Sequence, residues 1–244
     1  TMNQESLFME DQPLSRRMRV HEGTVREIKR LAFEQMAEGG AGAISMNAIA
    51  RQMGMSGPAL FRYFPNRDAL LTELVVEAYE ELAAAMEAEV TSDNPREAER
   101  MLRAQAMALR GWALAHPQRY LFIFGTPVPG FHPPADRTGP AAWRLLVAAI
   151  TPLISLVPGS WDPAADPFER ELERWATGSG LPAMPGVFLR QAFLSWTRLH
   201  GILSLEVAGH FSPALPDPAA LYRAEVDELI GMIRDYLPGQ RSGS

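Results

Sequence analysis

Apolar residues recur every three or four positions along most of the chain, which is the spacing of one face of an α-helix. The first such stripe predicts a helix over residues 20–37, and glycines at positions 39, 40 and 42 end it. A second long stripe predicts a helix from residue 66 or 67 to about residue 90. No segment shows a convincing two-residue alternation of the kind found in half-buried strands, so the pattern predicts an all-α fold.

Residues 45–64 predict two short helices joined by a tight turn. Ser45 is a suitable N-cap for the first helix, whose apolar residues follow at helical spacing (Met46, Ile49, Ala50 and Met53). Gly54 permits the left-handed conformation that ends a helix. Ser56 then caps a second helix, and Pro58 lies in its first turn. Proline is tolerated there because the N–H that it lacks would have no partner within the helix. Two short helices around a glycine turn predict a helix-turn-helix, whose second helix can enter the major groove of DNA.

The rest of the chain predicts further helices separated by irregular connections. These helices cover residues 96–115, 117–124, 140–156, 167–176, 187–208 and 218–237. Residues 125–140 hold five prolines and three glycines, so we expect a loop there, either a pocket lid or a simple surface loop. We therefore expect three parts: a flexible tail (1–14), a helix-turn-helix DNA-binding domain (15–66), and a helical regulatory and dimerisation domain (67–240). The helix over residues 66–90 would join the two domains.

The charge of the chain changes sign along the sequence. The chain has 244 residues, of which 47% are hydrophobic, enough to bury a full core, and its net charge is −6. Residues 15–67 hold nine basic residues against four acidic ones, whereas the residues after them carry a net charge of −8. A basic N-terminal part lets an otherwise acidic protein contact DNA phosphates at one end, because electrostatic attraction depends on the local field.

Several functions are disfavoured by what the sequence lacks. It has no apolar run near the roughly 18 residues that span a bilayer, no signal-peptide pattern and no cysteine, so we expect a cytoplasmic protein with no membrane partner. The five histidines show no metal-ligand spacing, and no phosphate loop, zinc-protease motif or serine elbow is present. We expect no catalytic residue, no metal site and no cofactor, and a protein that is not an enzyme. Two alternatives stay open: an all-α enzyme or scaffold that has lost DNA binding, and a metal-responsive regulator.

The helix-turn-helix block resembles the TetR family of bacterial transcriptional regulators. The resemblance rests on Ile49-Ala50, Gly54, Ser56, the run 60–67, and Leu70-Leu71, preceded by a helix of the right length. Further along, Trp196, His200 and Gly201 resemble the Trp-His-Gly signature of one C-terminal subtype of that family, and the segment 112–117 resembles its Trp-Ala-x-x-His-Pro element. The resemblance implies a homodimer that binds a palindromic DNA operator, generally as a repressor, and leaves it when a small-molecule effector binds.

The same resemblance implies which residues meet DNA. The candidate DNA-binding residues are Ser45, Asn47, Ser56, Gly57, Pro58, Ala59, Phe61, Arg62, Tyr63 and Arg67. The residues from Gly57 to Tyr63 are expected on the recognition helix, while Ser45 and Arg67 match positions that contact phosphate. Arg62 and Asn47 are the better hydrogen-bonding candidates. The family usually has tyrosine where Phe61 stands, so a hydroxyl-to-phosphate hydrogen bond is missing here. Lysine is commoner in the family where Arg67 stands, a change that should keep phosphate binding.

The C-terminal part is rich in aromatic residues, which could line an apolar cavity or simply fill the core. The candidate ligand-binding residues are Trp112, His116, Phe122, Phe124, Trp143, Arg144, Phe193 and Trp196, with His116 and Arg144 as polar anchors. His200 is expected to be a hydrogen-bonded core or interface residue. A regulator without an effector, whose core would be solid, is the alternative within this class.

The last two predicted helices carry apolar stripes that could pack within one chain or against a second copy. The stripe of the first runs Phe193, Trp196, Leu199, Leu203 and Val207, and that of the second runs Tyr222, Val226, Leu229, Ile230, Ile233 and Leu237. The family resemblance favours a homodimer through these helices. An effector would then act by swinging the helix over residues 66–90 and changing the spacing of the two recognition helices.

Overall fold

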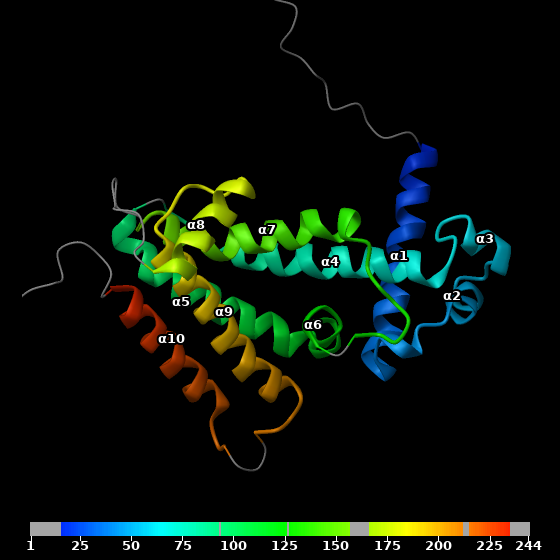
Figure 1. The fold of residues 1–244 in the computed structure, drawn as a ribbon. Helices are drawn as coiled ribbons and strands as arrows, with labels where there is room; N and C mark the ends of the chain where they lie inside the picture. Colours follow the sequence, from blue (N-terminus) through cyan, green and yellow to red (C-terminus); the bar gives the residue numbers. More distant parts are fainter. Residues whose placement is uncertain (1–15, 93, 126, 157–165, 212–214, 235–244) are drawn as a thin grey trace, which may run out of the picture. The chain divides into compact units, whose positions relative to one another are not determined.

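The computed structural model describes residues 16–92, 94–125, 127–156, 166–211 and 215–234. The tail predicted over residues 1–14 and the end of the last predicted helix, with Leu237, lie outside these ranges. Within them every regular element is helical, and the prediction of an all-α fold is confirmed (Figure 1). The α-helices are α1 (Arg16–Gly39), α2 (Met46–Gln52), α3 (Gly57–Phe61), α4 (Arg67–Glu87), α5 (Ala98–Ala115), α6 (Pro117–Phe124), α7 (Ala135–Ile154), α8 (Pro167–Gly178), α9 (Gly186–Val207) and α10 (Pro218–Arg234), with short 3₁₀ turns η1 (Ala41–Ala43) and η2 (Pro95–Glu97).

The chain divides into two compact units, residues 1–70 and 71–244, here called the N-terminal and C-terminal units. In the N-terminal unit, α1, α2 and α3 bury a small apolar core that includes Ile28, Met36, Ile49 and Leu60, each at 0% exposure. Burial of such side chains is what holds helices as short as α2 and α3, because isolated helices of this length are unstable in water. The helix α4 starts in the N-terminal unit and continues in the C-terminal unit.

In the C-terminal unit, α5 packs against α7, α9 and α10, and α9 also packs against α8 and α10. Figure 1 shows α9 and α10 side by side. Tyr120 and Tyr222 are fully buried in this core, and the Tyr222 hydroxyl donates to the Ala106 carbonyl oxygen at 2.9 Å. Among the described residues, no helix is long and apolar enough to cross a membrane.

The seventh helix differs from the prediction. It begins at Ala135, so the last six residues of the predicted loop over residues 125–140 are helical, and Pro140 and Pro152 lie inside the helix. A proline within a helix leaves the carbonyl four residues earlier without its N–H donor. For Pro140 that carbonyl belongs to Asp136, an exposed residue whose backbone water can satisfy. For Pro152 it belongs to Ala148, which is buried and needs another donor.

Candidate nucleic-acid interface and ligand cavity

The predicted turn of the helix-turn-helix is present, and Ser56 precedes α3 as expected, but the Ser56 side chain makes no capping hydrogen bond. The Ser45 hydroxyl accepts the Ala48 N–H at 3.3 Å, and the Ser45 N–H donates to Gln35 of α1 at 2.8 Å. Gly54 has a φ of 63°, in the left-handed region that glycine adopts without strain. These contacts fix where α2 starts and where the chain turns towards α3.

Most of the candidate DNA-binding side chains lie on the surface of the N-terminal unit. Ser45, Asn47, Ser56, Pro58, Phe61 and Arg62 are exposed, while Gly57, Ala59 and Tyr63 are partly exposed. The helix α3 ends at Phe61, so Arg62 and Tyr63, expected on the recognition helix, lie instead in the turn that follows it. Phe61 keeps 43% of its surface exposed, which gives this face a large apolar contact where the family usually has a hydroxyl.

A basic hollow lies beside these residues within the N-terminal unit. It is lined by Arg16, Arg17, Val20, His21, Arg62 and Tyr63. The His21 and Tyr63 rings stack with centroids 4.9 Å apart, which joins the first turns of α1 to the turn after α3. Three guanidinium groups around one hollow favour a phosphate group. Arg16, Arg17 and His21 were not among the predicted site residues, although the basic excess of residues 15–67 already pointed to this region.

Arg67, predicted to contact phosphate, is bonded to the backbone of the N-terminal unit in the structure. Its Nε donates to the Ile44 carbonyl oxygen at 3.2 Å, and its Nη2 donates to the carbonyl oxygens of Ala41 at 2.7 Å and Gly42 at 3.5 Å. These bonds tie η1 to the first residue of α4. The guanidinium is therefore engaged by the protein's own backbone, a role that its sequence position did not indicate.

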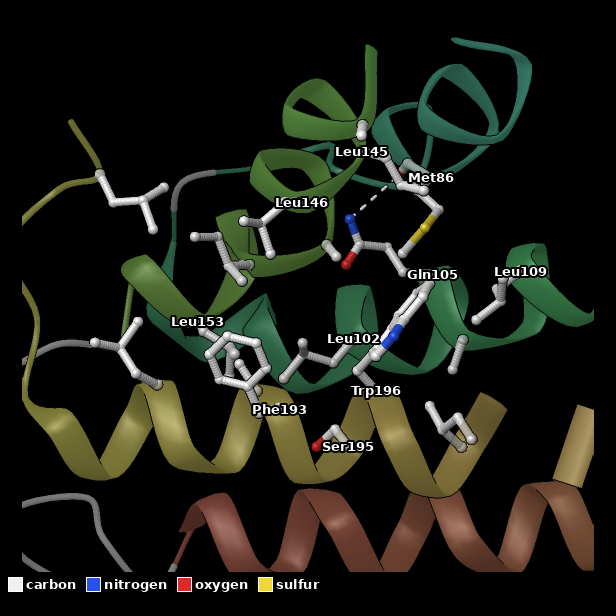
Figure 2. A pocket seen from close by; sticks show the side chains of 18 of the residues that line it. Met86, Leu102, Gln105, Leu109, Leu145, Leu146, Leu153, Phe193, Ser195 and Trp196 are labelled. Carbon is white, nitrogen blue, oxygen red and sulfur yellow. Dashed lines mark hydrogen bonds between the residues drawn. The ribbon is translucent and has the colours of Figure 1, made fainter. Parts of the chain in front are cut away.

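The C-terminal unit contains an apolar cavity of about 310 Å³, at the small end of the range for small-molecule sites. Helices α4, α5, α6, α7, α8, α9 and α10 all contribute to its lining (Figure 2). Three of the predicted ligand-binding residues, Phe124, Phe193 and Trp196, belong to this lining. Phe193 and its neighbour Trp175 are 40% and 39% exposed, so they combine contact with the cavity and contact with solvent.

The most buried polar residue of the lining is Gln105, at 2% exposure. Its Nε2 donates to the Met86 carbonyl oxygen at 3.2 Å and to the Ala148 carbonyl oxygen at 2.8 Å. The second of these is the carbonyl that Pro152 leaves without a helical donor. Tyr79 also lines the cavity, and burial raises the pKa of its hydroxyl. Neither residue was predicted, because a glutamine or a tyrosine on a helix carries no signal of what faces it.

His200 lies behind the aromatic part of the lining. Its ring stacks on Trp196 with centroids 5.6 Å apart and meets Phe124 edge to face at 5.1 Å. Its Nδ1 is 2.8 Å from the Tyr120 hydroxyl, and it also bonds the Phe124 backbone. Burial lowers the pKa of His200 and raises the pKa of Tyr120 to about 12, so both groups are neutral near pH 7. His200 thus joins α6 to α9 as a hydrogen-bonded core residue.

Comparisons with known proteins match both units. Residues 28–74 match the family model described as bacterial regulatory proteins, tetR family, and residues 102–229 match the tetracyclin repressor-like C-terminal domain. The chain is also 33% identical over 223 residues to the HTH-type transcriptional regulator Rv1816 of Mycobacterium tuberculosis, covering 86% of this chain and 92% of the relative. The chain belongs to the TetR family of bacterial transcriptional regulators. The resemblance noted from the helix-turn-helix block is therefore confirmed.

Solved structures agree with this membership. The TetR-family chain is similar to the crystal structure of SCO4313, with 42% identity, a TM-score of 0.74, and coverage of 89% of this chain and 100% of that one. The TetR-family regulator PfmR of Thermus thermophilus shares the fold at 18% identity and a TM-score of 0.51, over 85% of this chain and 96% of PfmR. Members of the TetR family are transcriptional regulators and not enzymes, and they bind DNA and small-molecule effectors as dimers.

Five of the residues predicted to bind ligand in this TetR-family chain lie outside the cavity lining. Trp112 is 9% exposed and packs in the core beside His116, the residue at the corner between α5 and α6, where burial lowers the pKa of the imidazole. Phe122 stacks on Phe131, whose burial pins the loop over residues 127–134. That loop contributes no residue to the lining, as expected of a surface loop.

The other two are Trp143 and Arg144. Trp143 packs beside Trp175, with ring centroids 6.5 Å apart, without lining the cavity itself. Arg144 is exposed and pairs with Glu87 of α4 at 2.9 Å, which lowers the pKa of that carboxyl group. Arg144 therefore joins α7 to α4 on the surface and does not line the cavity.

The stripes predicted for a dimer are largely used within the single chain. Five residues of the second stripe, Tyr222, Val226, Leu229, Ile230 and Ile233, are buried, and so is Leu203 of the first. Phe193 of the first stripe is 40% exposed, and three large apolar residues outside both stripes are exposed as well: Leu194 at 41%, Leu205 at 45% and Leu221 at 38%. In α9, Leu194, Gly201 and Leu205 share one helix face, since they are separated by seven and four residues.

Proposed function

We propose that this TetR-family regulator is a homodimeric repressor that leaves a palindromic operator when a small molecule occupies the cavity of the C-terminal unit. The N-terminal domain, residues 15–66, would bind DNA through the exposed face of α2 and α3, and residues 67–240 would form the regulatory and dimerisation domain. Such a protein acts in the cytoplasm, where bacterial DNA lies.

The DNA contact would combine two kinds of side chain. Asn47 and Arg62 can hydrogen-bond base edges or phosphates, while Pro58, Ala59 and the exposed ring of Phe61 can pack on thymine methyl groups. The hollow formed with Arg16 and Arg17 extends the contact to a further phosphate group, since guanidinium groups bind phosphate oxygens in pairs. Most of the affinity would be electrostatic and would fall with added salt.

The observation that carries the effector proposal is the course of α4. Its first residue, Arg67, is bonded to the backbone of η1 beside the helix-turn-helix, and its later residues Tyr79 and Met86 line the cavity. One continuous helix thus belongs to both sites. A ligand that prefers one arrangement of this helix over another shifts the population towards it, and the DNA-binding units would move with the helix.

The exposed face of α9 and α10 supports the dimer. Leu194, Leu205 and Leu221 are large apolar residues left in water by the single chain, and Gly201 lets a second helix approach closely. A second copy of the chain would cover them in a four-helix arrangement with a two-fold axis. Leu205→Asp should therefore convert the dimer to a monomer in sedimentation experiments.

The proposed function is tested by selecting bound DNA from a random pool with the full chain. We expect a palindrome whose half-sites lie about one DNA turn, or a multiple of it, apart. Arg62→Met should lower the affinity for the selected site, whereas Arg174→Met, which removes the same charge from the exposed face of α8, should not. Selection of no palindrome, or equal affinities for both variants, would refute the proposal.

A further inference from the structure

The chemical character of the cavity lining restricts what can occupy it. Its lining is formed mainly by Leu, Ile, Ala, Met and aromatic side chains, and among the residues that the structure describes it includes no Lys, Arg, His, Asp or Glu. The residues with polar side-chain groups are Tyr79, Gln105, Ser195, Trp175 and Trp196. An ionised ligand group would lose its hydration here without gaining a counter-charge, which costs far more than burying a neutral group.

The orientation of the Gln105 amide follows from the fold. Its nitrogen lies between two backbone carbonyl oxygens, those of Met86 and Ala148, and only an N–H can satisfy a carbonyl. Both amide hydrogens are thereby used. Turning the amide over would place its oxygen against two carbonyl oxygens, and the Ala148 carbonyl, for which Pro152 supplies no N–H, would lose this donor.

The Gln105 oxygen is consequently fixed as an acceptor. Figure 2 shows it pointing into the cavity, away from the bond to Met86. Among the described residues no donor is bonded to it, and although Gln105 as a residue is only 2% exposed, this oxygen is open to the cavity. No protein group bonds this oxygen, so a molecule that brings a donor to this point gains a hydrogen bond that the protein itself does not make.

We propose that the cavity binds a neutral, largely hydrocarbon molecule with one hydroxyl or N–H group, which donates to Gln105 Oε1. This inference rests on the proposed function only in treating the cavity as the effector site. Phenols, long-chain alcohols and similar neutral donors fit this chemistry. Fatty-acid carboxylates, acyl thioesters of charged carriers and cationic drugs do not.

Three probes with one hydrocarbon skeleton test the proposal: para-hexylphenol, para-hexylanisole and para-hexylbenzoate. Their affinities are measured by titration calorimetry with the full-length protein without DNA, after unfolding and refolding to remove any co-purified ligand. The phenol should bind most tightly, the anisole, which lacks the donor, about 3- to 10-fold more weakly, and the benzoate at least about 100-fold more weakly. Equal affinities for phenol and anisole, or preference for the benzoate, would overturn the proposal.

Two variants place the probes in the cavity and on Gln105. Ala149→Phe fills the cavity and should abolish phenol binding, whereas phenol binding that survives it would overturn the assignment. Gln105→Met should reduce the phenol-to-anisole ratio to about one, and Ser195→Ala, which removes another polar group of the lining, should preserve it. If the preference is instead lost in Ser195→Ala and kept in Gln105→Met, Gln105 is not the partner.

The outcome does not depend on every variant folding. Gln105→Met leaves two backbone carbonyls without this donor, so its helicity is checked first, and the probe series on the natural chain decides the question if the variant is unfolded. Because the probe affinities are measured without DNA, they remain valid even if the protein neither represses a gene nor releases an operator. A protein that releases its operator with a carboxylate would support the proposed function while refuting the ligand chemistry.

Discussion

Replacing Arg67 with methionine separates a structural role of this residue from a role in phosphate binding. The guanidinium makes its two shorter bonds to the carbonyl oxygens of Ile44 and Ala41, at 3.2 and 2.7 Å. Ile44 is only 4% exposed, so at least one of the acceptors is poorly reached by water. Arg67→Met should therefore loosen η1 and the start of α2, and the charge that it removes is one already bonded to backbone carbonyl oxygens.

The size of the effect follows from the bonds that are lost. A hydrogen bond to a charged group contributes about 1.5–3 kcal/mol, and partial exposure of this pair reduces the total to about 2–3 kcal/mol. That free energy corresponds to an opening of the segment that is about 30- to 150-fold more frequent. Hydrogen exchange followed by mass spectrometry on peptides covering residues 41–52 measures this opening directly.

The matched control is Arg62→Met, which removes the same charge from an exposed residue after α3. We expect Arg62→Met to leave exchange unchanged and to reduce the salt dependence of operator binding by about one phosphate contact per protomer. Arg67→Met should show the opposite pattern. If Arg67→Met leaves exchange unchanged and flattens the salt dependence, the argument from the backbone bonds is wrong.

Three further predictions concern the stability of the C-terminal unit, measured by urea unfolding of the full chain. Arg110 and Glu206 form an ion pair at 2.9 Å with side-chain exposures of 16% and 10%, so either single change to methionine should cost about 3 kcal/mol, but the double change only about 1 kcal/mol. Burial lowers the pKa of His200, so the unfolded chain binds a proton more readily than the folded one. The free energy of unfolding should therefore fall as the pH drops from 7 past the unfolded pKa of about 6.5. If this pH dependence is the same in His200→Asn, the prediction is wrong. Gly186→Ala should cost about 1–3 kcal/mol because its Cβ would lie 2.4 Å from the Glu169 carbonyl oxygen, whereas Gly111→Ala, with nothing within 4 Å, should be neutral or stabilising.

Features with a local cause could be predicted from the sequence. The cap at Ser45, the turn at Gly54 and the start of α3 around Pro58 depend on residues within a few positions of each other. The start of α7 could not be predicted in this way. Pro140 is a strong helix breaker by its local chemistry, but the carbonyl it leaves unpaired belongs to an exposed residue, so the helix continues at little cost.

The candidate ligand site was predictable only in part, because its members are defined by partners distant in the chain. Aromatic content pointed to Phe124, Phe193 and Trp196, which do line the cavity. Arg144 was predicted to anchor a ligand, and nothing in the sequence indicates that it pairs with Glu87, 57 positions earlier. Gln105 gave no signal, since its bonding reaches 19 residues back and 43 residues forward.

The aromatic lining of the cavity also provides an optical probe of its occupancy. Trp175 and Trp196 belong to the lining, and all five tryptophans of the chain follow residue 71 in the sequence. The N-terminal unit contains none, so indole emission reports on the C-terminal unit and carries no direct signal from residues that meet DNA. Quenching or a spectral shift in the presence of both operator and ligand can thus be attributed to the C-terminal unit, which lets cavity filling and DNA release be timed separately in one sample.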